Sequence, residues 1–393
     1  MVLVGSKMSI SNRIKDFYKA MGKLKEMVVP NSFRKAREKI KPELYKYLNT
    51  RSVQMYYKQG SEYVKRWRGK LLWAVDGSMI NLPDSEETKA FYSIQSNQTK
   101  KERVQALISV LYDVLNEVTI NAEIGEKQAE NKFVFDNHGL EYSTEAVVLY
   151  DRLYADYKVI NFHNSSEVDF VIRCPISNRF PQVDKFLASK KVDQIIDLKI
   201  PKNLEKSAQE KNIKRSIKVR LVKVILSTGE VEILITSLLN RKKYSLKNFQ
   251  WLYHQRWGIE TYFDRLKNLL EVERFSSGSS QFIEQDFFAS IFTSSIESII
   301  CKEDEAKMQQ DHLEKGTKYC YKVNKAVSYS EIGETLVHLL LDSNKSAEEV
   351  FDELQSIFRV SPCPIRPDRV SSRYKMTEAD RLRVAKYAKK TFT

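Results

Sequence analysis

The sequence WLYHQRWGIETYFDRLKNLLEVERF, residues 251–275, decides how the rest of the chain is interpreted. It contains no proline and a single glycine. Its apolar residues Leu252, Ile259, Phe263 and Leu266 recur at helical spacing. We therefore expect one amphipathic helix over this stretch, with its apolar stripe facing a core.

Four polar residues follow one side of this expected helix. At about 100° per residue, Tyr253, Arg256, Glu260 and Lys267 fall within a ~60° arc beside the apolar stripe. Asp264 lies on the same arc and competes with Glu260 for any role. By spacing alone, the simpler interpretation is a solvated face on which Arg256 and Glu260, four residues apart, form an ordinary ion pair.

The order and spacing of these residues indicate a functional motif, not only a solvated helix face. Tyr-x2-Arg-x3-Glu-x6-Lys resembles the YREK signature of DDE transposases in the fourth family of bacterial insertion sequences, and the following LEVERFS is also similar to that family. The resemblance implies that Glu260 is the third member of a catalytic triad. Two aspartates should then lie upstream of it.

Two aspartates stand in a suitable setting. LLWAVDGSMINLP, residues 71–83, is an apolar run that leads into Asp76, and the apolar residues 146–150 lead into Asp151. An aspartate after a strand is more often part of a turn than a ligand. Both surroundings, VDGSMINLP and YDRLY, nevertheless resemble the catalytic-aspartate motifs of the family. Asp84 and Asp156 are the nearby alternatives.

The strand pattern predicts an α/β (α+β) ribonuclease-H-like core. We expect one strand over 71–83, two strands joined by an Asn-Glu turn within 103–124, and further strands at 146–150 and 169–175. Together they form a five-stranded mixed sheet, with a crossover helix within 125–145.

The distance from Asp151 to Glu260 indicates an insertion. The 108 residues between them are many more than an ordinary connection needs, and they contain three β-rich runs with a hairpin turn at 227–230. The predicted organisation is a helical basic DNA-binding region (1–70), a first part of the catalytic core (71–175), a β-rich insertion (176–245), a signature helix (246–290) and a helical C-terminal region with a basic tail (291–393).

The charge distribution points to a polyanionic partner. The formal net charge is +14, and residues 1–70 hold 18 Lys or Arg against 5 Asp or Glu. Arg34, Arg37 and Lys41, on a helix expected to begin at an N-capping Ser32, could line one face against DNA phosphates. A solvated basic helix is the alternative for any one of them. The tail from Arg366 onwards is a second candidate DNA-contacting arm, with simple disorder as the alternative.

Other classes of protein are disfavoured. The four cysteines are far apart, which predicts neither a disulfide framework nor a zinc site and fits a reducing compartment. No apolar run approaches the ~18 residues that span a bilayer. We therefore expect a cytoplasmic protein, close to a bacterial nucleoid and not associated with a membrane.

Three converging carboxylates predict metal-dependent chemistry. Asp76, Asp151 and Glu260 would repel one another unless cations neutralised them. Oxygen ligands without His or Cys favour two Mg²⁺ ions, with Mn²⁺ as a substitute, an arrangement suited to phosphoryl transfer. The resemblance implies that Tyr253, Arg256 and Lys267 hold DNA phosphates, which makes Tyr253 a contact and not a nucleophile.

The resemblance further implies cleavage at the terminal inverted repeats and strand transfer into target DNA by a complex of two transposases. Two alternatives remain from the sequence: a ribonuclease-H-like nuclease that cuts without joining, and a catalytically inactive DNA-binding descendant. The resemblance implies that some members of the family pass through a hairpin at the transposon end, a step that a tryptophan stacked on a flipped base would suit. Trp251 could do this, although packing against the sheet is the simpler interpretation.

Overall fold

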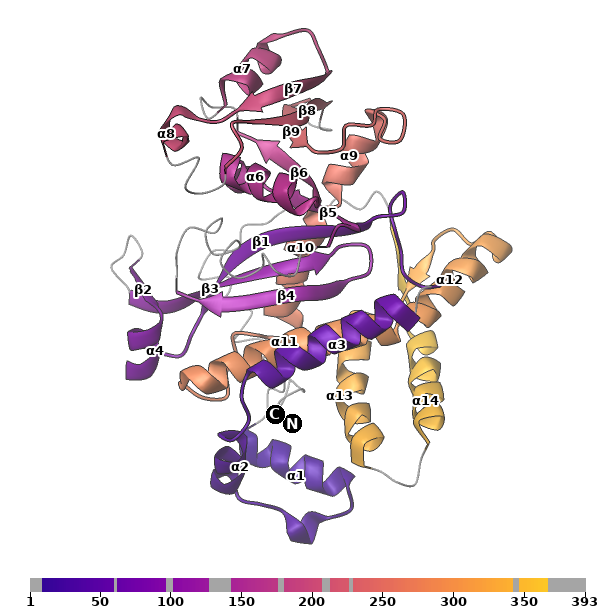
Figure 1. The fold of residues 1–393 in the computed structure, drawn as a ribbon. Coiled ribbons are helices and arrows are strands. Elements are labelled where there is room, and N and C mark those ends of the chain that lie inside the picture. The colour runs from indigo at the N-terminus through magenta and orange to yellow at the C-terminus, as the bar shows by residue number, and fades with distance from the viewer. Residues whose placement is uncertain are drawn as a thin grey trace.

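The computed structural model describes residues 9–59, 62–96, 102–126, 143–175, 180–206, 213–225, 229–341 and 346–366. Its centre is a nine-stranded sheet (Figure 1). Eight strands follow the order β2-β3-β1-β5-β6-β9-β8-β7, and β4 pairs with β3. The strands are β1 (Leu71–Asn81), β2 (Ser93–Ser96), β3 (Glu102–Asp113), β4 (Val118–Gly125), β5 (Ala146–Tyr150), β6 (Asp169–Cys174), β7 (Asp193–Lys199), β8 (Ser216–Ile225) and β9 (Val231–Thr236), with a separate pair β10 (Tyr321–Lys322) and β11 (Cys363–Pro364).

The five strands expected from the sequence are neighbours, in the order β4-β3-β1-β5-β6. β3 is antiparallel to β1 and β4, whereas β5 is parallel to β1 and β6. The turn between β3 and β4 contains Asn116 and Glu117, as predicted, and Glu117 has a φ of 57°. The expected crossover helix falls mainly on residues 127–142, and the expected hairpin turn at 227–230 falls partly on 226–228. Both segments lie outside the described residues.

The prediction of a five-stranded sheet was wrong, because the β-rich insertion extends the sheet. β9 pairs antiparallel with β6, β8 pairs with β9, and β7 pairs with β8. Without β9, the outer edge of β6 would expose unpaired backbone N–H and C=O groups. The strands of the insertion satisfy that edge and form one continuous hydrogen-bonded sheet with the core.

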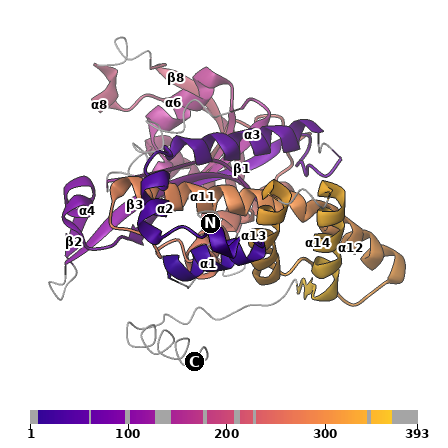
Figure 2. The same ribbon diagram turned by 90° about the horizontal axis from the view of Figure 1, so that it is seen from below.

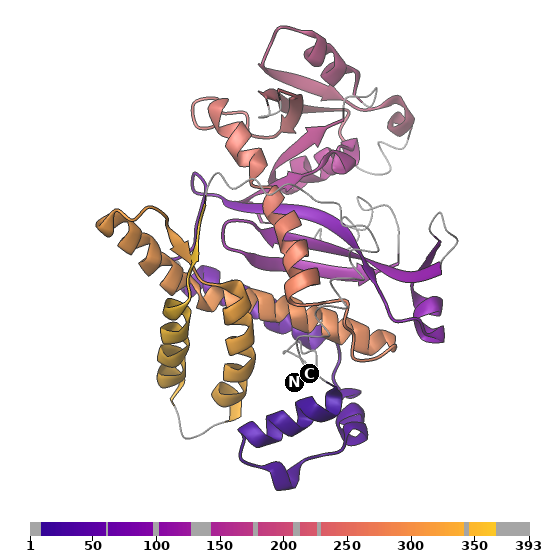
Figure 3. The ribbon, with the colours of Figure 1, turned by 180° about the vertical axis from the view of Figure 1, so that it is seen from behind.

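Helices cover both faces of the sheet. On one face lie α9 (Lys247–His254), α10 (Trp257–Asp264) and α11 (Ser280–Ile300), which Figure 3 shows from behind. On the other face lie α6 (Tyr157–Ser166) and α7 (Pro181–Ala188). Successive side chains of β1 alternate between the two cores: Leu72 and Ala74 pack in the first, Leu71 and Trp73 in the second. The centre of the sheet is therefore buried on both sides.

Most of the helices from the N-terminal and C-terminal regions lie below the sheet in Figure 1. α3 (Glu43–Gln59) runs beside α11 under the sheet (Figure 2), and both contact β4. The other helical segments are α1 (Ile10–Ala20), η1 (Leu24–Glu26), α2 (Pro30–Arg37), α4 (Glu86–Phe91), η2 (Arg152–Tyr154), α8 (Lys202–Glu205), α12 (Lys302–Lys315), α13 (Lys325–Leu341) and α14 (Ala347–Val360). α2 starts earlier than expected: Pro30 occupies its first turn and Val29, not Ser32, is the N-cap. Residues 367–393, which hold most of the basic tail, lie outside the described residues.

The single helix expected over residues 251–275 is also corrected. α9 ends at His254, α10 begins at Trp257, and α10 continues into a π-helical segment, η3 (Arg265–Leu269). At the junction, the N–H of Arg256 donates to the carbonyl of Tyr253, three residues back, and Gly258 donates likewise to Gln255. This tighter pattern interrupts the α-helical ladder and separates the two helices.

No helix in the described ranges is long and apolar enough to cross a membrane.

A buried arginine fastens the insertion to the segment that leads into α9. Arg220, in β8, donates to both carboxylate oxygens of Asp193 at 3.0 and 2.6 Å and to the carbonyls of Leu238 and Tyr244 at 3.2 and 2.7 Å. Its guanidinium also lies 5.0 Å from the ring centroid of Phe249. One buried cation thereby joins β7, β8 and the start of α9.

We expect Arg220→Met to lower the free energy of unfolding by about 3 to 5 kcal/mol, because the substitution leaves Asp193 partly buried without its main cation. Chemical denaturation measures this loss. Arg241→Met is the matched control, since Arg241 pairs with the same aspartate at 3.3 Å but is half exposed, and its loss should stay below about 1 kcal/mol. Equal losses in the two variants would contradict the anchoring role.

Candidate functional site

The pairing of β1 with β5 brings two aspartates together. The strands are parallel, and Val75 is the register partner of Tyr150, so the residues that follow, Asp76 and Asp151, lie at neighbouring positions about 5 Å apart in the backbone. Alternation along both strands directs the two carboxylates to the face covered by α10. Asp76 also accepts a hydrogen bond from the N–H of Gly77 at 2.9 Å.

α10 carries Glu260 to the same place. The helix packs on β1 through the buried Ile259, Tyr262 and Phe263. Glu260 lies on the more exposed side of this packing face, with a third of its side chain accessible. The third acid therefore reaches the two aspartates, one in the middle of β1 and one just after β5, from a separate element.

Arg256 lies among the three acids. Its Nη2 donates to Glu260 Oε1 at 2.9 Å, and its Nη1 lies 3.8 Å from Asp76 Oδ2. Burial alone would lower the pKa of this guanidinium, but the nearby Tyr253, the Glu260 hydrogen bond and the Asp151 carboxylate outweigh burial and raise the pKa. The arginine is thus a cation held at the centre of a carboxylate cluster.

Tyr253 packs against the Arg256 guanidinium. The side chain is almost fully buried, and its ring centroid lies 5.7 Å from the guanidinium carbon of Arg256. Burial raises the pKa of the phenol, so Tyr253 stays protonated. Within the described residues, neither its hydroxyl nor the Nε of Arg256 has a hydrogen-bond partner. Two buried donors are therefore left open beside the carboxylates.

Lys267 reaches the site from the π-helical segment. Its Nζ donates to Ser78 Oγ at 2.8 Å and to the carbonyl of Met79 at 2.7 Å. Both acceptors belong to β1, within three residues of Asp76. All four residues of the signature thus face the same part of the sheet, although they do not lie on one continuous helix.

The alternative acids lie elsewhere. Asp264 is exposed and accepts from Asn268 at 2.6 Å. Asp156 caps α6 by accepting from the N–H of Lys158 at 2.8 Å, and Asp84 pairs with Lys89 at the surface. Glu260, and not Asp264, is the acid of the signature stretch that contacts Arg256.

The carboxylates do not form a ready metal site in this conformation. In the described part of the chain, no group of three or more His, Cys, Asp or Glu side chains is arranged to hold a metal ion. The donor chemistry of Asp76, Asp151 and Glu260 suits a hard cation. The Arg256 guanidinium lies between two of these acids, Glu260 and Asp76.

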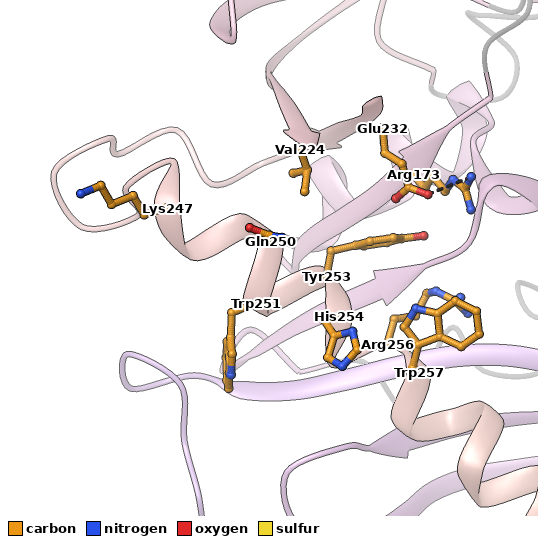
Figure 4. A pocket seen from close by; sticks show the side chains of 10 residues that line it. All are labelled: Arg173, Val224, Glu232, Lys247, Gln250, Trp251, Tyr253, His254, Arg256 and Trp257. Carbon is orange, nitrogen blue, oxygen red and sulfur yellow. Dashed lines mark ion pairs between the residues drawn. The ribbon is translucent and has the colours of Figure 1, made fainter. Parts of the chain in front are cut away.

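A cavity of about 440 Å³ adjoins these residues (Figure 4). Its walls include Tyr253, Arg256 and the two tryptophans of residues 251–275, Trp251 and Trp257. Trp251 is 46% exposed, so nearly half of its side-chain surface is open to solvent. The sequence had not drawn attention to Trp257, although it immediately follows Arg256.

Two further residues of the cavity come from the sheet. Arg173 of β6 and Glu232 of β9 form an ion pair of 2.8 Å in its wall. Burial raises the pKa of Glu232, while Arg173 and Arg256 oppose the rise. The sequence offered no signal for this pair, because its members are 59 positions apart and meet only through the pairing of β6 with β9.

The three N-terminal basic residues have different surroundings. Arg34 is mostly exposed, with Glu38 at 3.5 Å, and Lys41 is exposed. Arg37 is buried: its guanidinium donates to Gln285, Ser276, the carbonyl of Phe282 and Asp286, all in or just before α11. In this conformation Arg37 fastens α2 to α11 and does not face solvent.

Comparisons with known proteins bear on this arrangement. The family model described as "Transposase DDE domain" matches residues 67–296, which include Asp76, Asp151 and Glu260. Among solved structures, the chain is similar to one titled "Cryo-EM structure of piggyBac transposase synaptic complex with hairpin DNA (SNHP)". That match has 10% identity and a TM-score of 0.39, and covers 88% of this chain and 68% of the other. No curated protein matches.

We expect Tyr253→Phe to leave the free energy of unfolding unchanged or to raise it by up to about 3 kcal/mol, because it removes a buried hydroxyl that has no hydrogen-bond partner in the described part of the chain. Thermal or urea denaturation measures the change. Tyr262→Phe is the matched control: its buried hydroxyl accepts from Thr119 Oγ1 at 2.8 Å, and its loss should cost about 1 to 3 kcal/mol. Similar losses in the two variants would mean that the Tyr253 hydroxyl has a structural role.

Proposed function

The chain belongs to the family of transposases with a DDE domain, and from this premise we propose that it is the transposase of a bacterial insertion sequence. Transposases of this family act by DNA cleavage and strand transfer. The chain would bind the terminal inverted repeats, cleave there and join the freed 3′ ends to target DNA. The observation that carries the proposal is the convergence of Asp76, Asp151 and Glu260, from three separate elements, around Arg256.

Asp76, Asp151 and Glu260 are the proposed catalytic and metal-binding residues. An all-oxygen donor set favours Mg²⁺, with Mn²⁺ as a substitute. Two such ions, held by these three residues, would activate the attacking water or 3′-hydroxyl and would stabilise the leaving 3′ oxygen. The five strands β4-β3-β1-β5-β6 would then be a ribonuclease-H-like core that presents the first two acids at adjacent strand positions.

Arg256 has two proposed roles. Without DNA it offsets part of the negative charge of the acids, which would otherwise repel one another more strongly at short range. With DNA, its planar fork would turn to a phosphate of the transposon end, a geometry that guanidinium groups bind well. Among the residues that the structure describes, the Tyr253 hydroxyl and the Arg256 Nε have no hydrogen-bond partner, which supports their use as phosphate donors. Lys267 would exchange its contacts to β1 for another phosphate.

Double-stranded DNA is the proposed partner, engaged by two copies of the chain. In the basic N-terminal region, residues 1–70, the exposed Arg34 and Lys41 are suited to contact the DNA backbone. Arg37 would contribute indirectly, because it holds α2 against α11 in the orientation in which Arg34 is presented. This division of labour amends the expectation that all three residues line one DNA-binding face.

We expect Glu260→Gln to abolish cleavage of labelled DNA that carries the flanking inverted repeat, assayed with Mg²⁺ and with EDTA. The amide keeps the shape of the side chain but removes the charge that a metal ion requires. Wild type should nick at the repeat boundary only with Mg²⁺. The variant should lose at least about 10³-fold in rate, or about 4 kcal/mol, while still binding the DNA.

Asp264→Asn is the matched control for this assay, since Asp264 lies one turn further along α10 and points to solvent. It should cleave like wild type. Binding without cleavage by the wild-type protein would support an inactive DNA-binding descendant. Cleavage without joining would support a nuclease, and activity that depends on Asp264 but not on Glu260 would refute the proposed triad.

We expect Arg256→Gln to tighten Mn²⁺ binding in the absence of DNA by about tenfold or more, because the variant lacks the cation that competes for the carboxylates. Calorimetry on the free protein measures the affinity independently of activity. Arg274→Gln is the control, because the exposed Arg274 pairs with a different acid, Glu271, at 3.0 Å. Equal affinities of wild type and Arg256→Gln would show that the guanidinium does not occupy the metal-binding position.

A further inference from the structure

A second hollow, of about 950 Å³, lies in the insertion, away from the carboxylates. It is formed by α7, the end of β7, α8 and the start of β8, in the upper part of Figure 1. Buried Phe180 and Ile200 are among the residues that line it. β7 is the edge strand of the sheet, so the hollow lies at the margin of the molecule.

The polar lining of this hollow is mainly cationic. Lys185, Lys199, Lys202 and Arg215 all line it and are all exposed, whereas the described lining contains a single acid, Glu205. None of the four cations forms an ion pair with another described residue. Cations gathered without matching acids repel one another, and they are suited to an anionic partner.

The position of the hollow relative to the acids is set by the sheet. β7 lies four strands from β5, which is about 19 Å at ~4.8 Å per strand. Successive register pairs place Asp193, at the start of β7, level with Asp151, and Lys199 lies six residues further along β7. Those six residues are a displacement of about 20 Å along the strands, at right angles to the ~19 Å across them, so the direct distance from the hollow to the acids is on the order of 28 Å.

We propose that this hollow binds the sugar-phosphate backbone of the transposon-end duplex, about eight base pairs from the position of cleavage. The inference rests on the proposed function. At ~3.4 Å per base pair, 28 Å corresponds to that length of duplex. Because hydrogen-bonded strands connect the hollow to the acids, a phosphate held in the hollow fixes how far along the end the scissile phosphate lies. The insertion then acts as a spacer between a backbone contact and the reacting position.

The choice of the terminal duplex as the occupant follows from the positive charge of the hollow and from its fixed position relative to the acids. A polyphosphate backbone matches four cations spread over one hollow, and such contacts position a duplex without reading its sequence. The terminal duplex is the DNA segment whose position must be fixed relative to the acids through every step. Target DNA, which enters only for strand transfer, is the competing occupant that the experiment must separate.

The test compares Lys199→Gln/Arg215→Gln with the control Lys190→Gln/Lys191→Gln. The control removes two exposed lysines from the turn before β7, at the opposite end of that strand. Binding to a long terminal duplex is measured with Ca²⁺ over a range of salt concentrations. We expect the first variant to bind about tenfold more weakly, with the slope of log K against log salt reduced by about 1 to 2. The control should match wild type.

Phosphate ethylation interference locates the contact. Wild type and control should show interference near the eighth base pair from the boundary, and the Lys199/Arg215 variant should lose that signal alone. Unchanged affinity and interference in a variant that still cleaves would overturn this inference while leaving the proposed function intact. Normal end binding with impaired strand transfer would assign the hollow to target DNA and also overturn it. Failure of the wild-type protein to bind the repeat would overturn both the proposed function and this inference.

Discussion

The parallel pairing of β1 with β5 is the constraint on which the site depends. The register of Val75 with Tyr150 puts Asp76 and Asp151 at adjacent positions, and both strands are buried on both faces. Two carboxylates so placed need a counter-charge. In this structure Arg256 provides the counter-charge. Its Nη2 lies 2.9 Å from Glu260 Oε1, and its Nη1 lies 3.8 Å from Asp76 Oδ2. One guanidinium offsets only part of the charge of three carboxylates, and it occupies the space between two of them, so binding of a further cation and release of the arginine should be coupled.

The interruption of the signature helix has a consequence for this coupling. Tyr253 belongs to α9, Glu260 to α10 and Lys267 to the π-helical segment. Arg256 lies at the junction of α9 and α10, where the α-helical ladder is already broken. A reorientation of the Arg256 side chain, or a change in the angle between α9 and α10, therefore breaks fewer backbone hydrogen bonds here than the same movement would break in the middle of a helix. The residue proposed to exchange partners occupies the least regular part of the segment.

The sequence predicted the local elements well and their assembly less well. The apolar runs that end at Asp76 and Asp151 were recognisable as buried strands, and the spacing of Arg256 and Glu260 correctly indicated that their side chains could meet. Pairing between distant segments was not accessible: nothing in β9 shows that it closes the edge of β6. The burial of Arg37 is similar, because its partners lie about 240 to 250 positions away on α11. The Arg173–Glu232 pair likewise exists only once the sheet is assembled. The helix break was missed because the stretch contains no proline and its apolar spacing continues through Gln255 and Arg256.

The most direct test of the account is to map the residues around a bound metal ion. Fe²⁺ in place of Mg²⁺, treated with ascorbate and peroxide, generates hydroxyl radicals that cut the polypeptide close to the ion, and mass spectrometry locates the cuts. The account predicts cuts clustered near residues 76, 151 and 260, suppressed by excess Mg²⁺ and absent from Glu260→Gln. Cuts confined to other acidic positions, or cuts near residue 76 that are unaffected by Glu260→Gln, would contradict the claim that the three carboxylates form one site.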